Sequence, residues 1–203
     1  MKKLMACLVA LMMVPMAAFA DFKEGVNYDI INQGKATATP EVREFFSFYC
    51  PHCYTFDKGY IPTLKAKLKE SSVPLKQNHV DFIGREMGVE MSKAFAIAEQ
   101  LGVLERIKPA MFAAIHDYKR PPATAKQIRD LFIANDVKPE DYDKAASSFM
   151  VQTQLAQMEQ RTKNAKISGV PTFVVNGKYR VNTQSIKSFE ELTDLIMYLT
   201  KKD

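Results

Sequence analysis

The sequence is poor in the residues that build metal sites and disulfide frameworks. It contains only three cysteines and three histidines among 203 residues. A structural zinc site usually requires four ligands, and His79 and His116 have no paired spacing with the cysteines. Only Cys50 and Cys53 lie close to each other, with two residues between them. This scarcity disfavours a structural zinc site, and we expect no bound metal.

The sequence also lacks an apolar run long enough for a membrane span, which needs roughly 20 residues. The longest run, Leu4 to Met16, follows two lysines and precedes Ala18-Phe19-Ala20, which has the small residues of a cleavage site. We therefore expect residues 1–20 to be a signal peptide and the mature chain to begin at Asp21. A membrane anchor and a lipoprotein signal at Cys7 are the alternatives, both less favoured.

The net charge is small, because 28 Lys and Arg residues oppose 23 Asp and Glu residues, giving +5. Removing residues 1–20 takes away two lysines and no acidic residue, which leaves +3 on the mature chain. An excess this small and dispersed disfavours nucleic-acid binding. The length of the mature chain suits one domain with a large insertion, or two small domains.

The two remaining cysteines are not spaced like a structural staple. Exported proteins usually keep cysteines as stabilising disulfides. A bridge between Cys50 and Cys53, however, would close only a four-residue loop, and the stabilisation gained from loop closure shrinks with loop length. The spacing therefore favours redox chemistry over a metal site or a staple.

The residues around the cysteine pair favour an oxidant. The apolar run Phe45 to Tyr49 leads into Cys50-Pro51-His52-Cys53, which predicts a buried strand that delivers Cys50 to a helix N-terminus. A thiolate there would lie against unpaired N–H groups and the positive end of the helix dipole. A protonated His52 would add a second stabilising charge. Stabilising the thiolate stabilises the reduced form, so the disulfide would readily be donated.

Glu44 is the unusual residue in the predicted strand 41–49, because strict alternation places it on a face with apolar neighbours. It could be a carboxylate that reaches water at a sheet edge. It could also be a buried acid beneath Cys53, with a raised pKa, that exchanges the proton of thiol chemistry. The nearby cysteines favour the second interpretation. Asp57, one turn after Cys53, is either a solvated charge or a group that tunes that thiol.

The hydrophobic pattern predicts an α/β sheet that is interrupted once by helices. Strands are expected at 26–31, 41–49, 73–82, 172–175 and 179–181, the last two joined as a hairpin by Asn176-Gly177-Lys178. Helices are expected at 51–69 with a break at Pro62, at 90–101, 105–119, 125–135, after Pro139, at 149–166, and after Ser188. His79 is expected to be a hydrogen-bonded structural residue. Residues 83–165 are predicted to form an inserted helical subdomain between residues 21–82 and 166–203.

Gly169-Val170-Pro171-Thr172 opens the predicted hairpin. A cis bond before Pro171 would have a use beside the cysteines, although such bonds are uncommon. Proline cannot donate a backbone hydrogen bond, so neighbouring backbone would be left to pair with a bound peptide. The ring would also occupy the space that a third ligand would need for the thiols to bind a metal.

Three segments together resemble the DsbA family of bacterial periplasmic thiol:disulfide oxidoreductases: Phe45 to Cys53, Gly169 to Thr172, and Asn176 to Tyr179. The resemblance covers essentially the whole mature chain. It implies a thioredoxin fold with an inserted all-helical subdomain. It also implies an exposed nucleophile at Cys50, a buried partner at Cys53, a thiolate-stabilising His52, a substrate-pairing Val170, a cis Pro171 against the disulfide, and Glu44 as the family's buried acid.

The sequence departs from this family in the third strand, where a lysine near the buried acid is common. In this chain the position is Gln77, and Lys76 faces the other side. We therefore expect Glu44 to lack a cationic neighbour and to have a pKa above the family's usual value. Asp57 stands where a glutamate is common.

The resemblance implies that the Cys50–Cys53 disulfide is donated, through a mixed disulfide at Cys50, to reduced unfolded proteins exported to the periplasm. These substrates would be held by an apolar surface near Pro171 and the helical cap. No cofactor is expected, a DsbB-like quinone-coupled inner-membrane protein would reoxidise the pair, and the protein would be a monomer. The alternatives are a disulfide isomerase or reductase on the same fold, and a peptide-binding chaperone without redox function.

Overall fold

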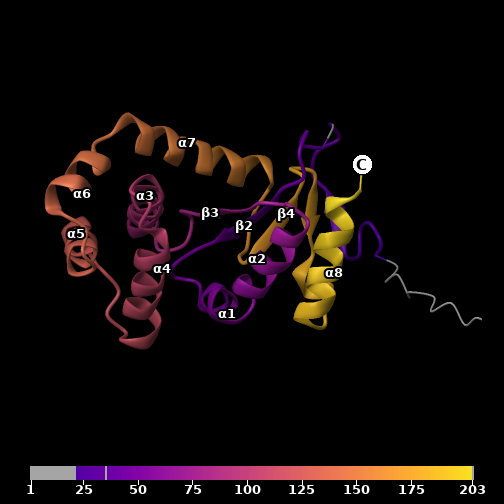
Figure 1. Ribbon diagram of the computed structural model, residues 1–203, viewed down its shortest axis with the longest axis horizontal. Coiled ribbons are helices and arrows are strands. Elements are labelled where there is room, and N and C mark those ends of the chain that lie inside the picture. The colour runs from indigo at the N-terminus through magenta and orange to yellow at the C-terminus, as the bar shows by residue number, and fades with distance from the viewer. Residues whose placement is uncertain (1–21, 35, 203) are drawn as a thin grey trace, which may run out of the picture.

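The computed structural model describes residues 22–34 and 36–202, which form a mixed sheet covered by helices (Figure 1). The predicted signal peptide and Cys7 lie outside the described residues. The strands are β1 (Tyr28–Ile30), β2 (Val42–Phe46), β3 (Leu75–His79), β4 (Thr172–Val175) and β5 (Tyr179–Val181). Their order across the sheet is β1-β5-β4-β2-β3. Only β2 and β3 are parallel, and β2 is a central strand between β4 and β3.

Both faces of the sheet are buried. On one face pack α1 (Pro51–Gly59), α2 (Ile61–Glu70) and α8 (Phe189–Thr200), and the short helix η2 (Thr183–Ser185) precedes α8. Leu64 and Leu68 of α2 share a core with Leu195 of α8 and Phe173 of β4. On the other face, Phe45 of β2 packs with residues just after α7. Burial on both faces explains the nearly continuous apolar character of β2.

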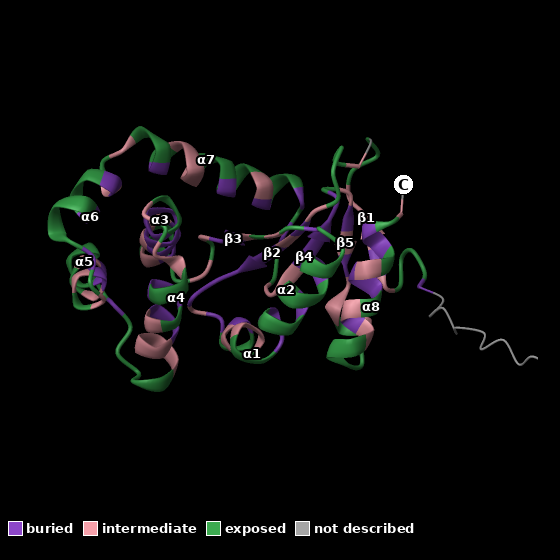
Figure 2. Ribbon diagram, viewed as in Figure 1, coloured by how far each residue is buried: buried purple, intermediate pink, exposed green. Residues whose placement is uncertain are grey.

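The helices between β3 and β4 wrap around one end of the sheet (Figure 1). They are α3 (Glu86–Gln100), α4 (Leu104–Phe112), the π-helix η1 (Ala113–Asp117), α5 (Ala125–Ala134), α6 (Pro139–Ala146) and α7 (Phe149–Asn164). Figure 2 shows α7 exposed along its outer side, with its buried residues turned inward. We call residues 83–165 the helical insert, and these boundaries stay a prediction.

The helical insert shares its hydrophobic core with the cysteine pair. Cys50 and Cys53 belong to the same buried cluster as Phe95 of α3 and Phe112 of α4. Phe46, at the end of β2, has its ring centroid 5.3 Å from that of Phe95. The insert therefore forms one wall of the region in which the cysteines lie.

The predicted strands at 26–31, 41–49 and 73–82 are longer than those observed. β2 ends at Phe46 because the backbone turns after it: Cys50 N–H donates to Ser47 O at 3.1 Å, and Tyr49 N–H donates to Ser47 Oγ at 3.2 Å. Residues 47 and 48 are buried although they lie in a loop. Their burial continues the run of buried positions in β2, so the sequence pattern resembled a longer strand. The predicted helix 105–119 likewise changes at residue 113 into a π-helix.

Several local predictions are confirmed. The helix 51–69 breaks at Tyr60, and Pro62 lies in the first turn of α2. Thr124 and Ser188 cap α5 and α8, accepting backbone N–H groups at 3.2 and 3.1 Å. The hairpin strands have the predicted bounds, and Asn176 and Gly177 both have positive φ angles, 53° and 62°. The Asn-Gly pair therefore forms the turn for which it is suited.

We expect Gly88→Ala to lower the free energy of unfolding by about 2 to 3 kcal/mol, because the first turn of α3 is overpacked by any side chain there. A Cβ at Gly88 would lie 2.1 Å from Asp81 O and 2.5 Å from Ile83 O, both backbone atoms. The matched control is Gly59→Ala in α1, where a Cβ meets nothing within 4 Å. That control should be neutral or stabilising by about 0.5 kcal/mol. Urea unfolding measures both, and equal stability of the two variants would contradict this packing.

Candidate active site

Cys50 is the N-cap residue of α1, as the sequence predicted. Its sulfur accepts a hydrogen bond from the backbone N–H of Cys53 at 3.1 Å, and Pro51 occupies the first turn of the helix. The thiol donates to the carbonyl of Val170 at 3.4 Å. Both cysteines are free thiols in this structure. The helix N-terminus and the loop before β4 therefore meet at the Cys50 sulfur.

The two cysteines differ in exposure less than expected. Cys53 is 0% exposed and Cys50 is 7% exposed. The expectation of an exposed Cys50 is thus wrong for this structure, because the backbone of Val170 lies against its sulfur. Cys50 is nevertheless the more accessible of the two thiols.

The same contacts separate the two thiols by acidity. The hydrogen bond from the Cys53 side chain is the main cause that lowers the pKa of Cys50 to about 7, helped by the backbone N–H groups of Cys53 and His52 and opposed by burial. Burial raises the pKa of the Cys53 thiol, and its hydrogen bond to Cys50 raises it further. Near neutral pH the thiolate is therefore carried by Cys50. His52 is exposed, and its contribution here comes from its backbone N–H; a stabilising role for its imidazole stays a prediction.

Glu44 is buried at 1% exposure within the central strand β2, which excludes the carboxylate at a sheet edge. The parallel register places it opposite Gln77, whose Nε2 donates to Glu44 Oε2 at 2.5 Å. Burial raises the pKa of Glu44 to about 7, opposed first by the positive charge of Lys108 and then by the Gln77 hydrogen bond. The charge of Glu44 in turn raises the pKa values of Cys50 and Cys53.

The expectation that Glu44 lacks a cationic neighbour is wrong. Lys108 of α4 supplies the positive charge from the helical insert, and it forms an ion pair with Asp57 of α1. Asp57 is therefore no solvated charge, since its side chain is only 17% exposed. The sequence held one signal for Lys108: it lies four residues after Leu104 and four before Phe112, on the apolar face of the helix.

Two histidines hold the backbone just before the cysteine motif. His79 is buried, and its Nε2 accepts from Phe48 N–H at 3.0 Å while Nδ1 lies 2.8 Å from Ser92 Oγ. Burial lowers the pKa of His79 to about 3, so the ring is neutral and structural, as predicted. His116 of η1 lies 2.8 Å from Phe48 O through Nε2 and stacks on the ring of Tyr54. No role for His116 could be predicted from the sequence, because nothing in the pattern places η1 beside α1.

The Val170–Pro171 peptide bond is cis, as predicted. Beside it lies a groove of about 700 Å³. The groove is lined by residues from α1, the loop before β4 and the segment after β5, including His52, Phe56, Val170, Pro171, Arg180 and Asn182. Its charged and amide side chains make it more polar than the apolar surface expected near Pro171.

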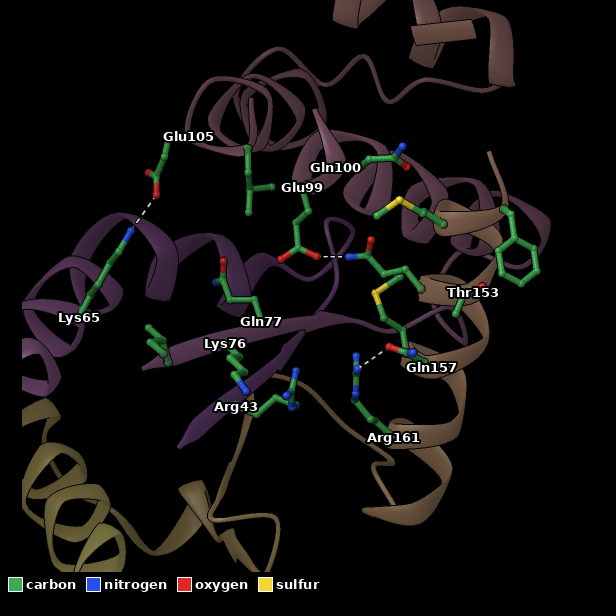
Figure 3. Close-up of a pocket in the computed structure, with 16 residues that line it drawn as sticks. Arg43, Lys65, Lys76, Gln77, Glu99, Gln100, Glu105, Thr153, Gln157 and Arg161 are labelled. Carbon is green, nitrogen blue, oxygen red and sulfur yellow. Dashed lines mark hydrogen bonds and ion pairs between the residues drawn. The ribbon is translucent and has the colours of Figure 1, made fainter. Parts of the chain in front are cut away.

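A second cleft, of about 710 Å³, lies between β3, α4 and α7, away from the cysteines (Figure 3). Arg43, Glu99 and Arg161 line it, and Lys65 of α2 pairs with Glu105 of α4 at 2.7 Å beside it. Within residues 22–34 and 36–202, no group of three or more His, Cys, Asp or Glu side chains is arranged so that it could hold a metal ion. In the same part of the chain, every helix is too short or too polar to cross a membrane.

Comparison with known proteins identifies the family. The model of the DSBA-like thioredoxin domain matches residues 41–194. The chain belongs to the DsbA family. The thiol:disulfide interchange protein DsbA of Dickeya dadantii is 38% identical over 98% of both chains, and that of Escherichia coli K12 is 34% identical over 100% of both.

Solved DsbA structures have the same fold. DsbA of Proteus mirabilis, in complex with the non-covalently bound peptide PWATCDS, superposes with a TM-score of 0.79 at 35% identity, covering 90% of this chain and 100% of that one. DsbA of Pseudomonas aeruginosa superposes with a TM-score of 0.78 at 27% identity, covering 90% and 94%. The chain is thus a thiol:disulfide oxidoreductase with a DsbA-like thioredoxin fold and a redox-active cysteine pair.

We expect the thiolate of Cys50 to form with a midpoint near pH 7, well below the ordinary thiol value of 9.0. Thiolate absorbance at 240 nm, followed during a pH titration of the reduced protein, measures it. Cys50→Ser should remove the transition, and Cys53→Ala should keep a transition while moving its midpoint upward, because the hydrogen bond that the Cys53 side chain donates to the thiolate is lost. A midpoint near pH 9 in the wild type would contradict the stabilisation of the thiolate.

Glu44 should make stability fall as pH rises. Its pKa is raised from 4.5 to about 7 in the folded state, so between these values the folded chain keeps a proton that the unfolded chain has released. The free energy of unfolding should therefore fall by about 3 kcal/mol from pH 4.5 to 7 and then level off. Glu44→Gln should lack this fall, and urea unfolding of both reduced proteins across this range measures the difference. Parallel profiles for the two proteins would exclude a buried, protonated Glu44.

Proposed function

We propose that the protein donates its Cys50–Cys53 disulfide to newly exported proteins. The observation that carries the proposal is the separation of the two thiols in acidity at the N-terminus of α1. A stabilised Cys50 thiolate lowers the free energy of the reduced form relative to the disulfide. The oxidised protein therefore gains free energy by passing its disulfide to another dithiol.

The reaction proceeds through a mixed disulfide at Cys50. A substrate thiolate attacks the Cys50 sulfur, the bond to Cys53 breaks, and Cys53 leaves and takes up a proton. A second substrate thiolate then attacks the substrate sulfur of the mixed disulfide, and Cys50 leaves as its stabilised thiolate. Two electrons pass from the substrate to the cysteine pair, so no further cofactor is required.

Glu44 supplies the proton that Cys53 takes up, and accepts it in the reverse direction. Its raised pKa of about 7 lets it hold or release a proton near neutral pH. Its burial beside the cysteine helix, and the influence of its charge on both thiols, support this role. An acid of this kind is needed because the buried Cys53 thiolate is otherwise a poor leaving group.

The substrate lies along the groove beside Pro171. The backbone of Val170 pairs with an extended peptide, and His52 and Arg180, which also line the groove, lie within reach of it. The polar lining suits peptide backbone and mixed side chains better than a purely apolar segment. Peptide binding by the Proteus mirabilis relative supports this assignment.

DsbA proteins are periplasmic, and we place this protein in the periplasm after cleavage of a signal peptide at residues 1–20. Its substrates there are reduced, unfolded exported proteins. A DsbB-like, quinone-coupled inner-membrane protein restores the disulfide, and the protein acts as a monomer. The remaining alternatives are a disulfide isomerase or reductase, which must be kept reduced, and a chaperone for which the cysteines are incidental.

We expect the redox equilibrium of the oxidised protein in glutathione buffers at pH 7 to favour the dithiol. Its reduction potential should lie well above the roughly −270 mV of thioredoxin. The same protein should oxidise a reduced, unfolded protein stoichiometrically, as measured by the loss of substrate thiols. A potential close to that of thioredoxin would favour the isomerase or reductase.

Two variants separate the mechanism from the chaperone alternative. Cys50→Ser should abolish oxidation, because the attacked sulfur is gone. Cys53→Ser should still form a mixed disulfide with substrate when it is first charged at Cys50 with a small disulfide, but should not regenerate the internal disulfide. Full activity of Cys50→Ser would overturn the proposed reaction.

A further inference from the structure

Lys108 is a buried cation that the helical insert carries into the redox site. The residue is 7% exposed, which is unusual for lysine. Its Nζ pairs with Asp57 of α1, and it lies 4.8 Å from the ring centroid of Phe46 and 5.9 Å from that of Phe112. A carboxylate and two aromatic faces therefore replace the water that a buried ammonium loses.

Lys108 faces Glu44 together with groups from the other elements packed around that carboxylate. From β3 comes Gln77, which donates a hydrogen bond to Glu44, and the charge of Lys108 also acts on the neutral His79 of the same strand. The titratable groups from α1 and its junction with α2 are Cys50, Cys53, Asp57 and Tyr60. Burial and the charge of Asp57 raise the pKa of Glu44, whereas the charge of Lys108 and, to a smaller extent, the Gln77 hydrogen bond lower it.

We propose that Lys108 is a positioning residue of the redox site, and that its charge sets the protonation of Glu44 and thereby the rate at which Cys53 loses its proton. This proposal rests on the proposed function of Glu44 as the group that exchanges that proton. It makes the helical insert part of the chemistry, since α4 carries the charge to a carboxylate on β2. A cleft of about 560 Å³, lined in part by Asp57, Gln77 and Lys108, brings this group of side chains next to solvent.

The step that reports this role is ring closure in the mixed disulfide between Cys50 and glutathione. Glu44 accepts the proton of the Cys53 thiol, and the Cys53 thiolate attacks the Cys50 sulfur. The Cys50–Cys53 bond forms, the bond from Cys50 to glutathione breaks, and glutathione leaves as its thiolate. Glu44 then releases the proton to solvent, which completes the exchange.

Lys108→Met should slow ring closure by raising the pH at which Glu44 loses its proton. We expect the midpoint of the rate–pH profile to move up by about one pH unit, so that closure below the midpoint is about tenfold slower. Isolated Cys50–glutathione mixed disulfide, with release of glutathione followed by mass spectrometry after acid quench, gives the profile. A folded Lys108→Met protein with the wild-type midpoint would overturn the proposal.

Three variants test that the charge itself is responsible. Lys108→Arg keeps the charge and should keep a profile close to the wild type. Gln77→Lys combined with Lys108→Met moves the ammonium to β3, against the same carboxylate, and should restore much of the lost rate. The matched control is Lys65→Met, which removes a lysine that also pairs with an acidic partner between α-helices, but at 62% exposure; its midpoint should not move.

The Glu44→Gln background separates this proposal from the function on which it rests. If Glu44 exchanges the proton, Glu44→Gln loses the wild-type pH profile, and adding Lys108→Met causes no further shift. A wild-type profile in Glu44→Gln would contradict the role of Glu44 itself. A shift by Lys108→Met that persists in Glu44→Gln would contradict only the role of Lys108.

A second variant is available if Lys108→Met does not fold because Asp57 is left buried and unpaired. Lys108→Met combined with Asp57→Asn removes both charges of the ion pair. Lys108 influences Glu44 more strongly than Asp57 does, so the midpoint should still move upward, though by less. An unchanged or lowered midpoint in this folded double variant would overturn the proposal.

Discussion

Most of the site depends on the hydrogen bond that the Cys53 N–H donates to the Cys50 sulfur. It exists because β2 ends at Phe46 and the chain turns before α1, so that the first sulfur caps the helix in which the second is buried. The cap leaves Cys50 7% exposed and Cys53 fully buried. Every difference between the two thiols follows from that placement, including which one meets the substrate and which one needs help with its proton.

The sheet and the insert both supply that help. The parallel pairing of β2 with β3 brings Gln77 to Glu44, and α4 brings Lys108 to Asp57 of the cysteine helix α1. Burial makes Glu44 keep its proton close to neutral pH, and the charge of Lys108 and the Gln77 hydrogen bond limit how far its pKa rises. The site therefore combines a Cys50 thiol of lowered pKa with a buried acid of raised pKa.

Local features of the sequence predicted much of this arrangement. The cysteine spacing, the Asn-Gly turn and the Thr124 and Ser188 caps act over a few residues, so their geometry follows from sequence patterns alone. The roles of Lys108 and His116 could not be predicted, because they depend on how α4 and η1 pack against α1. No pattern within those helices specifies that packing. The predicted strand 41–49 is longer than β2 for a related reason. Phe48 is buried by tertiary packing although it lies outside the sheet, and its apolar side chain therefore looked like part of the strand.

The sheet order has a consequence for how the chain acquires its structure during synthesis. β2 needs β4 as its antiparallel neighbour, yet the entire helical insert separates the two strands in sequence, so this pairing has a high contact order and forms late. Until β4 arrives, one edge of β2 stays open, and Cys50 has no Val170 carbonyl against its sulfur. A nascent chain thus holds both cysteines early but completes their surroundings only when its last segment has been synthesised.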